Sequence, residues 1–181
     1  MSLAPALLLS MPQLIDPNFA KSVVLLCEHA PEGAFGLVVN RPSDIAAAEA
    51  VRLEPPVAEP NDLPLLIGGP VEPERGWILT AQAPEHVEHR SVGAGLYLSA
   101  SPVLLRRALM SRPLPKRTVV LAGYAGWGPG QLDSELAESA WLIMPVELDL
   151  IFEIPSTSAW EMAIRRLGAD PHFLQMGHGI H

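Results

Sequence analysis

The chemistry that this sequence could support begins with one thiol and one imidazole, those of Cys27 and His29. A thiol becomes a good nucleophile when a nearby base removes its proton, and a histidine can be that base. The two residues lie two positions apart on an expected strand, so their side chains should point to the same face, with Cα atoms about 7 Å apart. That separation is poor for a direct hydrogen bond, and a free cysteine is also a common core residue. Two interpretations therefore stand, a catalytic pair and a buried thiol near a histidine.

Two further histidines, His86 and His89, lie beside Glu85 and Glu88. Their order, His-Val-Glu-His, matches neither of the zinc-protease patterns that place two histidines and a glutamate on one helix, and no thiol lies nearby. A solvated polar strand or turn accounts for these residues. The sequence predicts no metal site and no cofactor.

A glycine-rich segment, residues 123–132, places Tyr124 and Trp127 between an apolar strand and an acidic helical segment that begins near Gln131. Its glycines do not have the G-x-G-x-x-G spacing of a phosphate-binding loop, and the acidic residues that follow would repel a phosphate. One interpretation is a rigid recognition loop that displays Tyr124, Trp127 and Gln131 to a ligand or partner. The other is a structural hinge with Trp127 packed in the core.

Asn40 and Arg41 precede Pro42, which favours an extended backbone at Arg41. An arginine that is fixed in this way can fork onto a carboxylate, which belongs either to the protein or to a ligand. The internal carboxylates considered are those of Asp16, Glu28 and Glu135. If the turn and the glycine-rich segment form one binding surface, Arg41 should share a concave patch with Tyr124 or Trp127.

The charge of the chain argues against direct nucleic-acid binding. Twelve basic and twenty acidic residues give a formal net charge of −8, whereas a duplex-binding protein must neutralise several phosphates. Five basic residues fall close together in the sequence: Arg106, Arg107, Arg112, Lys116 and Arg117. The first of these fit the end of a helix, where cations are favoured, and no aromatic residue is interleaved with them.

The length and composition fit a single domain in the cytoplasm. The chain has 181 residues, of which 49% are hydrophobic, so a sizeable core is available. Its longest apolar run, residues 3–9, is too short for a membrane span of about 20 residues and lacks the flanks of a signal peptide. The single cysteine excludes an internal disulfide and agrees with a reducing compartment.

The pattern of residues predicts many short elements. Expected strands cover residues 6–9, 22–27, 35–39, 65–67, 76–80, 96–98, 118–121 and 141–144. Expected helices cover residues 43–51, 102–110, 131–140 and 160–167. Ser101 should cap the second of these helices, and Ser158 with Glu161 should form a capping box for the last.

The irregular order of these elements favours an α+β fold over a doubly wound sheet. The strands within residues 23–27, 37–39, 119–121 and 142–144 are apolar on both faces and should be interior, covered by the helices at 102–110 and 160–167. Residues 53–62 are rich in proline and acidic residues, so we expect a flexible loop there.

Five segments, in the same order, resemble the bacterial YqgE/AlgH family. They are residues 16–19 (Asp-Pro-Asn-Phe), 27–29 (Cys-Glu-His), 36–42 (Gly-Leu-Val-Val-Asn-Arg-Pro), 68–71 (Gly-Gly-Pro-Val) and the glycine-rich segment. The resemblance spans nearly the whole chain and implies an α+β fold in which a bifurcated, coiled mixed sheet packs around two core helices. Members of the family are often labelled transcriptional regulators, from a link to alginate production, and no biochemical activity is settled for them. This sequence departs from the family in residues 43–62, which vary in length and are here rich in proline.

Two classes of function remain open. The first is a non-enzymatic module that binds an unknown protein or small molecule through Asn40, Arg41 and the segment from Tyr124 to Gln131, and that regulates transcription indirectly. The second is an enzyme of unknown reaction that uses Cys27 and His29.

Overall fold

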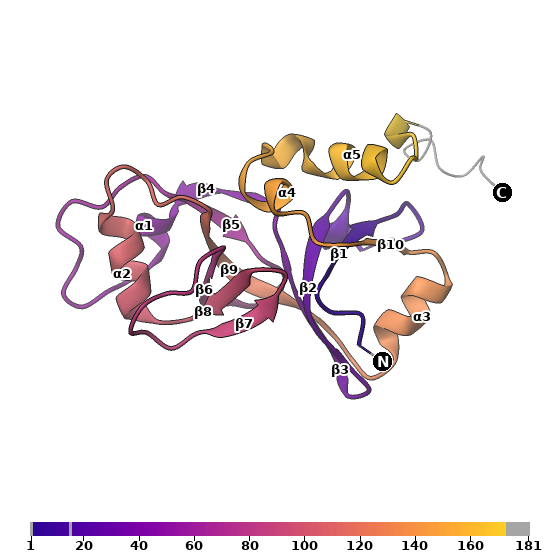
Figure 1. The fold of residues 1–181 in the computed structure, drawn as a ribbon, viewed down its shortest axis with the longest axis horizontal. Coiled ribbons are helices and arrows are strands. Elements are labelled where there is room, and N and C mark those ends of the chain that lie inside the picture. Colours follow the sequence, from indigo (N-terminus) through magenta and orange to yellow (C-terminus); the bar gives the residue numbers. More distant parts are fainter. Residues whose placement is uncertain (1, 15, 173–181) are drawn as a thin grey trace.

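The computed structural model describes residues 2–14 and 16–172, and Figure 1 shows one curled sheet running along the length of the molecule. Its strands are β1 (Ala6–Ser10), β2 (Val23–Ala30), β3 (Gly33–Val38), β4 (Pro42–Ala46), β5 (Pro64–Ile67), β6 (Val71–Thr80), β7 (Arg90–Gly93), β8 (Leu96–Ser99), β9 (Thr118–Trp127) and β10 (Trp141–Met144). Its helices are α1 (Ala47–Ala50), α2 (Pro102–Met110), α3 (Gln131–Ala137), α4 (Leu148–Phe152) and α5 (Ser156–Arg166), with a 3-10 turn at Pro17–Phe19. The fold is α+β, as expected.

Strand β9 is the branch point of the sheet. One edge of β9 pairs with β6, and the other edge pairs in parallel with β5 at residues 120–122 and antiparallel with β3 at residues 125–127. From β3 the sheet continues through β2 and β1 to β10, from β6 it continues through β8 to β7, and β4 pairs with β5. The sheet is therefore mixed and forked, with three arms meeting at one strand.

Glycines allow the two arms to part at the fork. The amide of Gly68 donates to the carbonyl of Ala122 in β9 at 2.7 Å, and the carbonyl of Gly68 accepts from the amide of Val38 in the other arm at 2.8 Å. A Cβ atom at Gly68 would lie 2.5 Å from the carbonyl oxygen of Gly123, so the two backbones touch. The Gly-Gly-Pro-Val segment and the glycine-rich segment therefore serve one crossing of the main chain.

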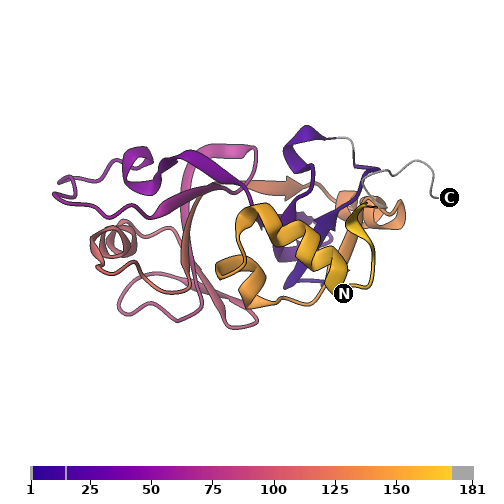
Figure 2. The same ribbon diagram turned by 90° about the horizontal axis from the view of Figure 1, so that it is seen from above.

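Three apolar clusters hold the helices against the sheet. The central core joins β1, β2, β6 and β9 to α4 and α5, and it contains Leu25, Leu79, Leu121 and Trp160. A second cluster, which we call the α3 core, lies on the other face of β2 and contains Leu26, Trp127, Leu132 and Trp141. A third, the α2 core, contains Ile78, Leu104, Leu109 and Val120. Figure 2 shows α5 lying across the β1–β2 part of the sheet and α2 at the opposite end of the molecule.

Helix α2 begins and ends on side-chain hydrogen bonds. The Ser101 hydroxyl accepts from the amide of Leu104, as the sequence predicts. At the other end, the buried Asn61 amide group donates to the carbonyls of Ala108 and Ser111 at 2.8 and 2.9 Å, where the helix ends. Arg112 donates to the carbonyl of Glu59 at 2.8 Å, so the proline-rich segment 53–62 is tied to the helix end.

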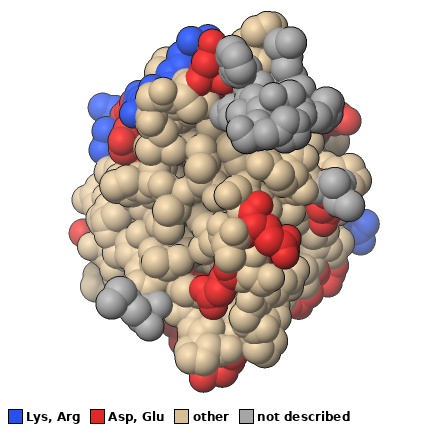
Figure 3. Space-filling view, turned by 90° about the vertical axis from the view of Figure 1, so that its right-hand side faces the viewer, with Lys and Arg blue, Asp and Glu red and all other residues tan. Residues whose placement is uncertain are grey.

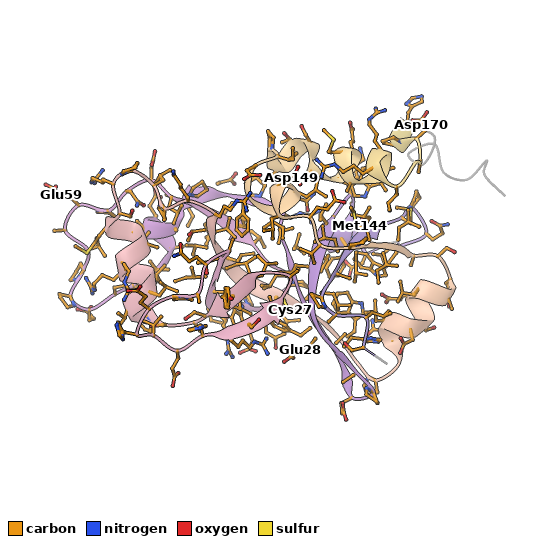
Figure 4. The ribbon with its side chains drawn as sticks, in the orientation of Figure 1. Cys27, Glu28, Glu59, Met144, Asp149 and Asp170 are labelled. Atoms are coloured by element: carbon orange, nitrogen blue, oxygen red, sulfur yellow. The ribbon has the colours of Figure 1, made fainter. Side chains whose placement is uncertain are left out.

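Helix α5 is joined to the chain before it by an ion pair. Arg166 in its last turn donates to both carboxylate oxygens of Asp149, at 2.9 and 2.6 Å. The guanidinium holds the pKa of the Asp149 carboxyl below its ordinary value. Figure 4 shows Asp149 next to the α4–α5 turn.

Several local expectations differ from the structure. Residues 43–46 of the expected helix belong to strand β4 and Ala47–Ala50 is helical, because pairing with β5 decides the conformation of the first part of the segment. The capping box at Ser158 is not formed, since α5 begins at Ser156 without a side-chain cap. The arrangement around two core helices is not confirmed. Strand β7 and helix α4 are elements that the sequence pattern did not reveal.

The interior strands follow the expectation at β2 and differ at β10. All residues of β2 from Val23 to Cys27 are buried, whereas Ile143 of β10 is 41% exposed. The reason is that β10 is the last strand of its arm and pairs only with β1. None of the helices that the structure describes has the length and apolar character needed to cross a lipid bilayer.

The fork predicts that Gly69→Ala destabilises the fold while Gly76→Ala does not. Gly69 has a φ of +153°, and a Cβ there would lie 2.2 Å from the carbonyl of Tyr124, whereas a Cβ at Gly76 meets nothing within 4 Å. We expect Gly69→Ala to cost about 2 kcal/mol or more and Gly76→Ala to stay within about 0.5 kcal/mol of the parent protein. Urea unfolding of the three proteins measures both, and equal midpoints would contradict the account of the fork.

Candidate functional site

A β-bulge at Cys27 separates Cys27 from His29. In the β2–β3 pairing Leu26 faces Gly36 and Glu28 faces Phe35, so Cys27 is an extra residue on its strand. The extra residue reverses the alternation of side chains. Cys27 packs in the central core, and His29, paired with Ala34, points to the α3 core side. The expectation that Cys27 and His29 share a face is therefore wrong, because it assumed a regular strand.

Both residues have other partners. The Cys27 thiol is 8% exposed and donates to the carbonyl of Leu25 at 3.6 Å. Burial raises the pKa of the Cys27 thiol to about 12, so it is protonated at neutral pH. Nδ1 of His29 accepts from the amide of Leu3 at 3.0 Å, which leaves the proton on Nε2, 3.0 Å from Oδ1 of Asp133. Figure 4 shows Cys27 and Glu28 near the middle of the molecule.

Trp127 and Gln131 belong to a hydrogen-bonded cluster around one carboxylate. The indole N–H groups of Trp127 and Trp141 both donate to Oε1 of Glu135, at 3.0 and 2.9 Å. Gln131 donates to Oε2 of the same carboxylate at 3.1 Å and accepts from the amide of Gly128 at 3.0 Å. Trp127 is only 7% exposed. This cluster fixes the start of α3 against the end of β9.

Tyr124 and Trp127 lie on opposite sides of the sheet. The segment that was expected to be a loop is the continuation of β9 as far as Trp127, and a separation of three residues on a strand reverses the face. Tyr124 packs at the edge of the central core, and Trp127 lies in the α3 core. The two rings therefore do not form one recognition surface.

Asn40 and Arg41 are occupied with the backbone of the preceding loop. The Asn40 side chain accepts from the amide of Val23 and donates to the carbonyl of Lys21, both at 2.9 Å. Arg41 donates to the carbonyls of Asn18 and Ala20, at 2.6 and 2.8 Å. The guanidinium thus forks onto two carbonyl oxygens, where we had expected a carboxylate, and Arg41 lines none of the hollows described below.

The remaining histidines and the clustered arginines also have local roles. His89 contacts the carbonyl of Val87 through Nδ1 at 2.9 Å, and the described residues contain no group of three or more His, Cys, Asp or Glu side chains able to hold a metal. Arg106, Arg107 and Arg112 donate to loop carbonyls, and Arg117 pairs with Glu153 at 2.8 Å. Figure 3 shows the end of the molecule that carries α3, where acidic side chains are scattered over a largely uncharged surface.

A hollow of about 680 Å³ lies where β3, β6 and β9 meet the β7–β8 hairpin, and we call it the aromatic hollow. The residues that define it are Phe35, Trp77, Tyr124, Arg75, Arg90 and Glu28. Its three rings contact one another, with centroids 5.0 Å apart for Phe35 and Tyr124 and 5.4 Å apart for Phe35 and Trp77. All three stand on strands of the sheet, so the backbone positions them rigidly.

Two arginines are stacked on these rings. Arg75 lies 4.4 Å above the ring of Trp77, and Arg90 lies 5.4 Å from the ring of Phe35. Arg90 also pairs with Glu28, whereas within the described residues Arg75 forms no ion pair or hydrogen bond. The aromatic hollow thus presents one guanidinium that forms no ion pair with a described carboxylate.

Tyr124 is held at the hollow by a strained residue. Its hydroxyl donates to the carboxylate of Glu72 at 2.8 Å, which raises the pKa of Tyr124 above its ordinary value. Glu72 has a φ of +45°, unusual for a residue with a side chain. It lies where β6 shifts its register against β9, between Val71 and Gly76. Strained backbone of this kind is often found at functional sites.

One buried donor at the hollow has no partner. The indole N–H of Trp77, a residue that is 9% exposed, makes no hydrogen bond with the described residues. A buried donor left unpaired costs about 1–3 kcal/mol, so few survive without a reason. Sequence reasoning did not identify this site. The one available signal was the spacing of Arg75 and Trp77, which places both on the same face of a strand and allows them to stack.

Thiol labelling tests the position of Cys27. We expect a thiol reagent to modify folded protein slowly at neutral pH and quickly after unfolding, because burial keeps the thiol protonated. His29→Ala should leave labelling of the folded protein slow, since His29 bonds Leu3 and Asp133. Fast labelling of the parent protein that His29→Ala suppresses would instead establish a thiol–imidazole pair.

Truncation of Trp127 tests whether it is structural. We expect Trp127→Ala to lower the free energy of unfolding by roughly 3–5 kcal/mol, as large-to-small core changes do. Trp127→Phe keeps a ring but loses the bond to Glu135 and part of the indole volume, so it should cost on the order of 1–3 kcal/mol, less than the Ala variant. Thermal or urea unfolding measures both, and an Ala variant as stable as the parent would mean that the ring does not support the fold.

Comparison with known proteins agrees with this architecture. An AlgH-like family model matches residues 7–172. A UPF0301 protein of Anaeromyxobacter dehalogenans is 44% identical over 98% of this chain and 94% of its own length. A second, of Methylococcus capsulatus, is 41% identical over 98% of this chain and 96% of its own length.

Two solved structures share the fold. The solution structure of the AlgH protein from Pseudomonas aeruginosa superposes with a TM-score of 0.78 at 34% identity, covering 100% of this chain and 97% of that one. A crystal structure of a Corynebacterium diphtheriae protein gives a TM-score of 0.67 at 23% identity, over 90% of this chain and 86% of that one, and shows the fold alone. The match over almost the full length means that this chain belongs to the AlgH-like family of uncharacterised bacterial proteins.

Proposed function

We propose that this chain is a non-enzymatic binding module whose aromatic hollow receives a small molecule or a side chain of a partner protein. The observation that carries the proposal is the combination of three rings with an unpaired guanidinium, that of Arg75, in one hollow of about 680 Å³. A hollow of this volume falls within the size range of ligand sites, and its aromatic walls lie beside polar groups that can orient a ligand.

The residue types at the hollow support this role. Tryptophan, tyrosine and arginine are the residues most enriched among those that dominate binding energy at interfaces. Trp77 and Tyr124 are held by strand pairing and by each other, with ring centroids 6.3 Å apart, so little conformational entropy is lost when a ligand binds. Of the residues that the sequence suggested for binding, Tyr124 is the one that we retain, because it lines the aromatic hollow and Asn40, Arg41, Trp127 and Gln131 do not.

The proposal assigns no reaction to the hollow. The nearest thiol, that of Cys27, is protonated because it is buried, and His29 faces the other side of β2. A regulatory effect on transcription would then be indirect, through the bound partner. Four of the five clustered basic residues use donors of their guanidinium groups within the protein, and the formal net charge of −8 opposes nucleic acid. We place the module in the cytoplasm, because its one cysteine needs no oxidising compartment.

Affinity isolation with matched variants tests the binding role. Tagged parent protein, Arg75→Glu, Tyr124→Ala and Arg52→Glu would each be recovered from a native bacterial extract, and bound proteins and small molecules identified by mass spectrometry. Arg52→Glu is the control, since Arg52 is exposed, lies outside the aromatic hollow and carries the same change of charge. Species that remain with the parent protein and the control and are lost from both hollow variants support the proposal. Retention by Arg75→Glu and Tyr124→Ala would reject it, provided that their circular dichroism matches the parent.

A further inference from the structure

We infer that the ligand of the aromatic hollow is a carboxylate carried on an apolar ring, with the guanidinium of Arg75 as its counter-ion. This inference rests on the proposed binding function and names the chemistry of what is bound. It is argued from the free N–H donors of Arg75, from the carboxylates at the hollow, and from the arrangement of the three rings.

The guanidinium of Arg75 is exposed and rests on a ring of the hollow. Stacking on Trp77 at 4.4 Å uses the face of the planar group, and the N–H donors of a guanidinium lie in its plane. Because no described side chain accepts from Arg75, these donors are free to form a bidentate pair with a carboxylate. A lysine in the same place would offer neither the stacking nor the fork.

The carboxylates at the hollow do not compete for Arg75. Glu28 pairs with Arg90, and Glu72 accepts from the hydroxyl of Tyr124 at 2.8 Å. Glu88 also lines the hollow. Three carboxylates at or beside the hollow oppose a ligand with a high negative charge, such as a phosphate ester dianion, more strongly than they oppose a single carboxylate. The cations that line the hollow are Arg75 and Arg90, so the surroundings disfavour a dianion more than a monoanion, and the attraction for a carboxylate comes from the fork of Arg75.

The rings provide the place for the body of the ligand. Phe35, Trp77 and Tyr124 meet edge to face or tilted, with centroids 5.0 to 6.3 Å apart. A further ring can join this arrangement with the same edge-to-face geometry. The guanidinium of Arg75, 4.4 Å from the ring of Trp77, lies beside these rings. A ligand with one carboxylate next to one ring therefore fits both the guanidinium and the three rings.

Two probes represent the two kinds of ligand that could carry a carboxylate on a ring. Phenylacetate stands for a small aryl acid, and N-acetylphenylalanine stands for the carboxyl end of a peptide. Their neutral amides keep the ring and lack the charge, and phenyl phosphate keeps the ring and raises the charge. Binding would be followed by ¹⁵N–¹H spectra, which report the indole signal of Trp77 and the side-chain signal of Arg75 directly.

We expect at least one of the two carboxylates to bind and to shift the Trp77 indole signal, with both amides and phenyl phosphate at least about tenfold weaker. Arg75→Gln should weaken carboxylate binding by about tenfold or more, whereas Arg52→Gln should leave it unchanged. Tighter binding of phenylacetate would indicate a small-molecule ligand, and tighter binding of N-acetylphenylalanine would indicate a peptide end.

Equal binding of acids and amides, or an unchanged affinity in Arg75→Gln, would overturn the inference. So would the absence of any shift with either acid in a protein whose spectrum shows that it is folded. The proposed binding function would still stand after these results if the hollow variants lose their partners in affinity isolation. If neither acid binds and the hollow variants also keep their partners in affinity isolation, the proposed binding function is rejected as well.

Discussion

The structure depends on the hydrogen bonds that β9 forms along both of its edges. One edge must serve β5 and β3 in turn, so the chain that leaves β5 has to pass between the two arms without a side chain in the way. Gly68 does this by bonding to Ala122 on one side and Val38 on the other. The three arms, the clusters on their faces and the hollow among them all follow from this crossing. The glycine motifs that drew attention in the sequence are therefore requirements of the backbone.

Much of the fold could be predicted from the sequence, and the reason differs from one element to another. The buried strand at residues 23–27 and the capped helix at 102–110 are determined by local apolar pattern and by Ser101, which are visible in the sequence. The helix expected at 43–51 forms at Ala47–Ala50, whereas residues 43–46 are in a strand because pairing with β5, a contact distant in sequence, decides their conformation. The sequence predicts a loop at the glycine-rich segment because glycine is common in loops. In the structure the small size of glycine instead permits two strands to cross.

The candidate site was less predictable, because it is assembled from contacts that no local pattern encodes. Trp127 and Gln131 resemble recognition residues in sequence, and only the position of Glu135 shows that they serve the protein itself. Arg75 and Trp77 drew no attention, although their spacing allows stacking on a strand. Which arginine remains without a carboxylate depends on the placement of Glu28, Arg90 and Tyr124 in three other strands.

The bulge at Cys27 has a consequence for the shape of the sheet. A strand with one residue more than its partner must bend, and its right-handed twist increases at that point. The β2–β3 hairpin therefore leaves the plane of the strands behind it, and its turn projects from the body of the molecule (Figure 1). This curvature brings Glu28 and Phe35 over β6 and closes one wall of the hollow. The extra residue thus contributes through geometry, by converting a flat sheet surface into a concave one.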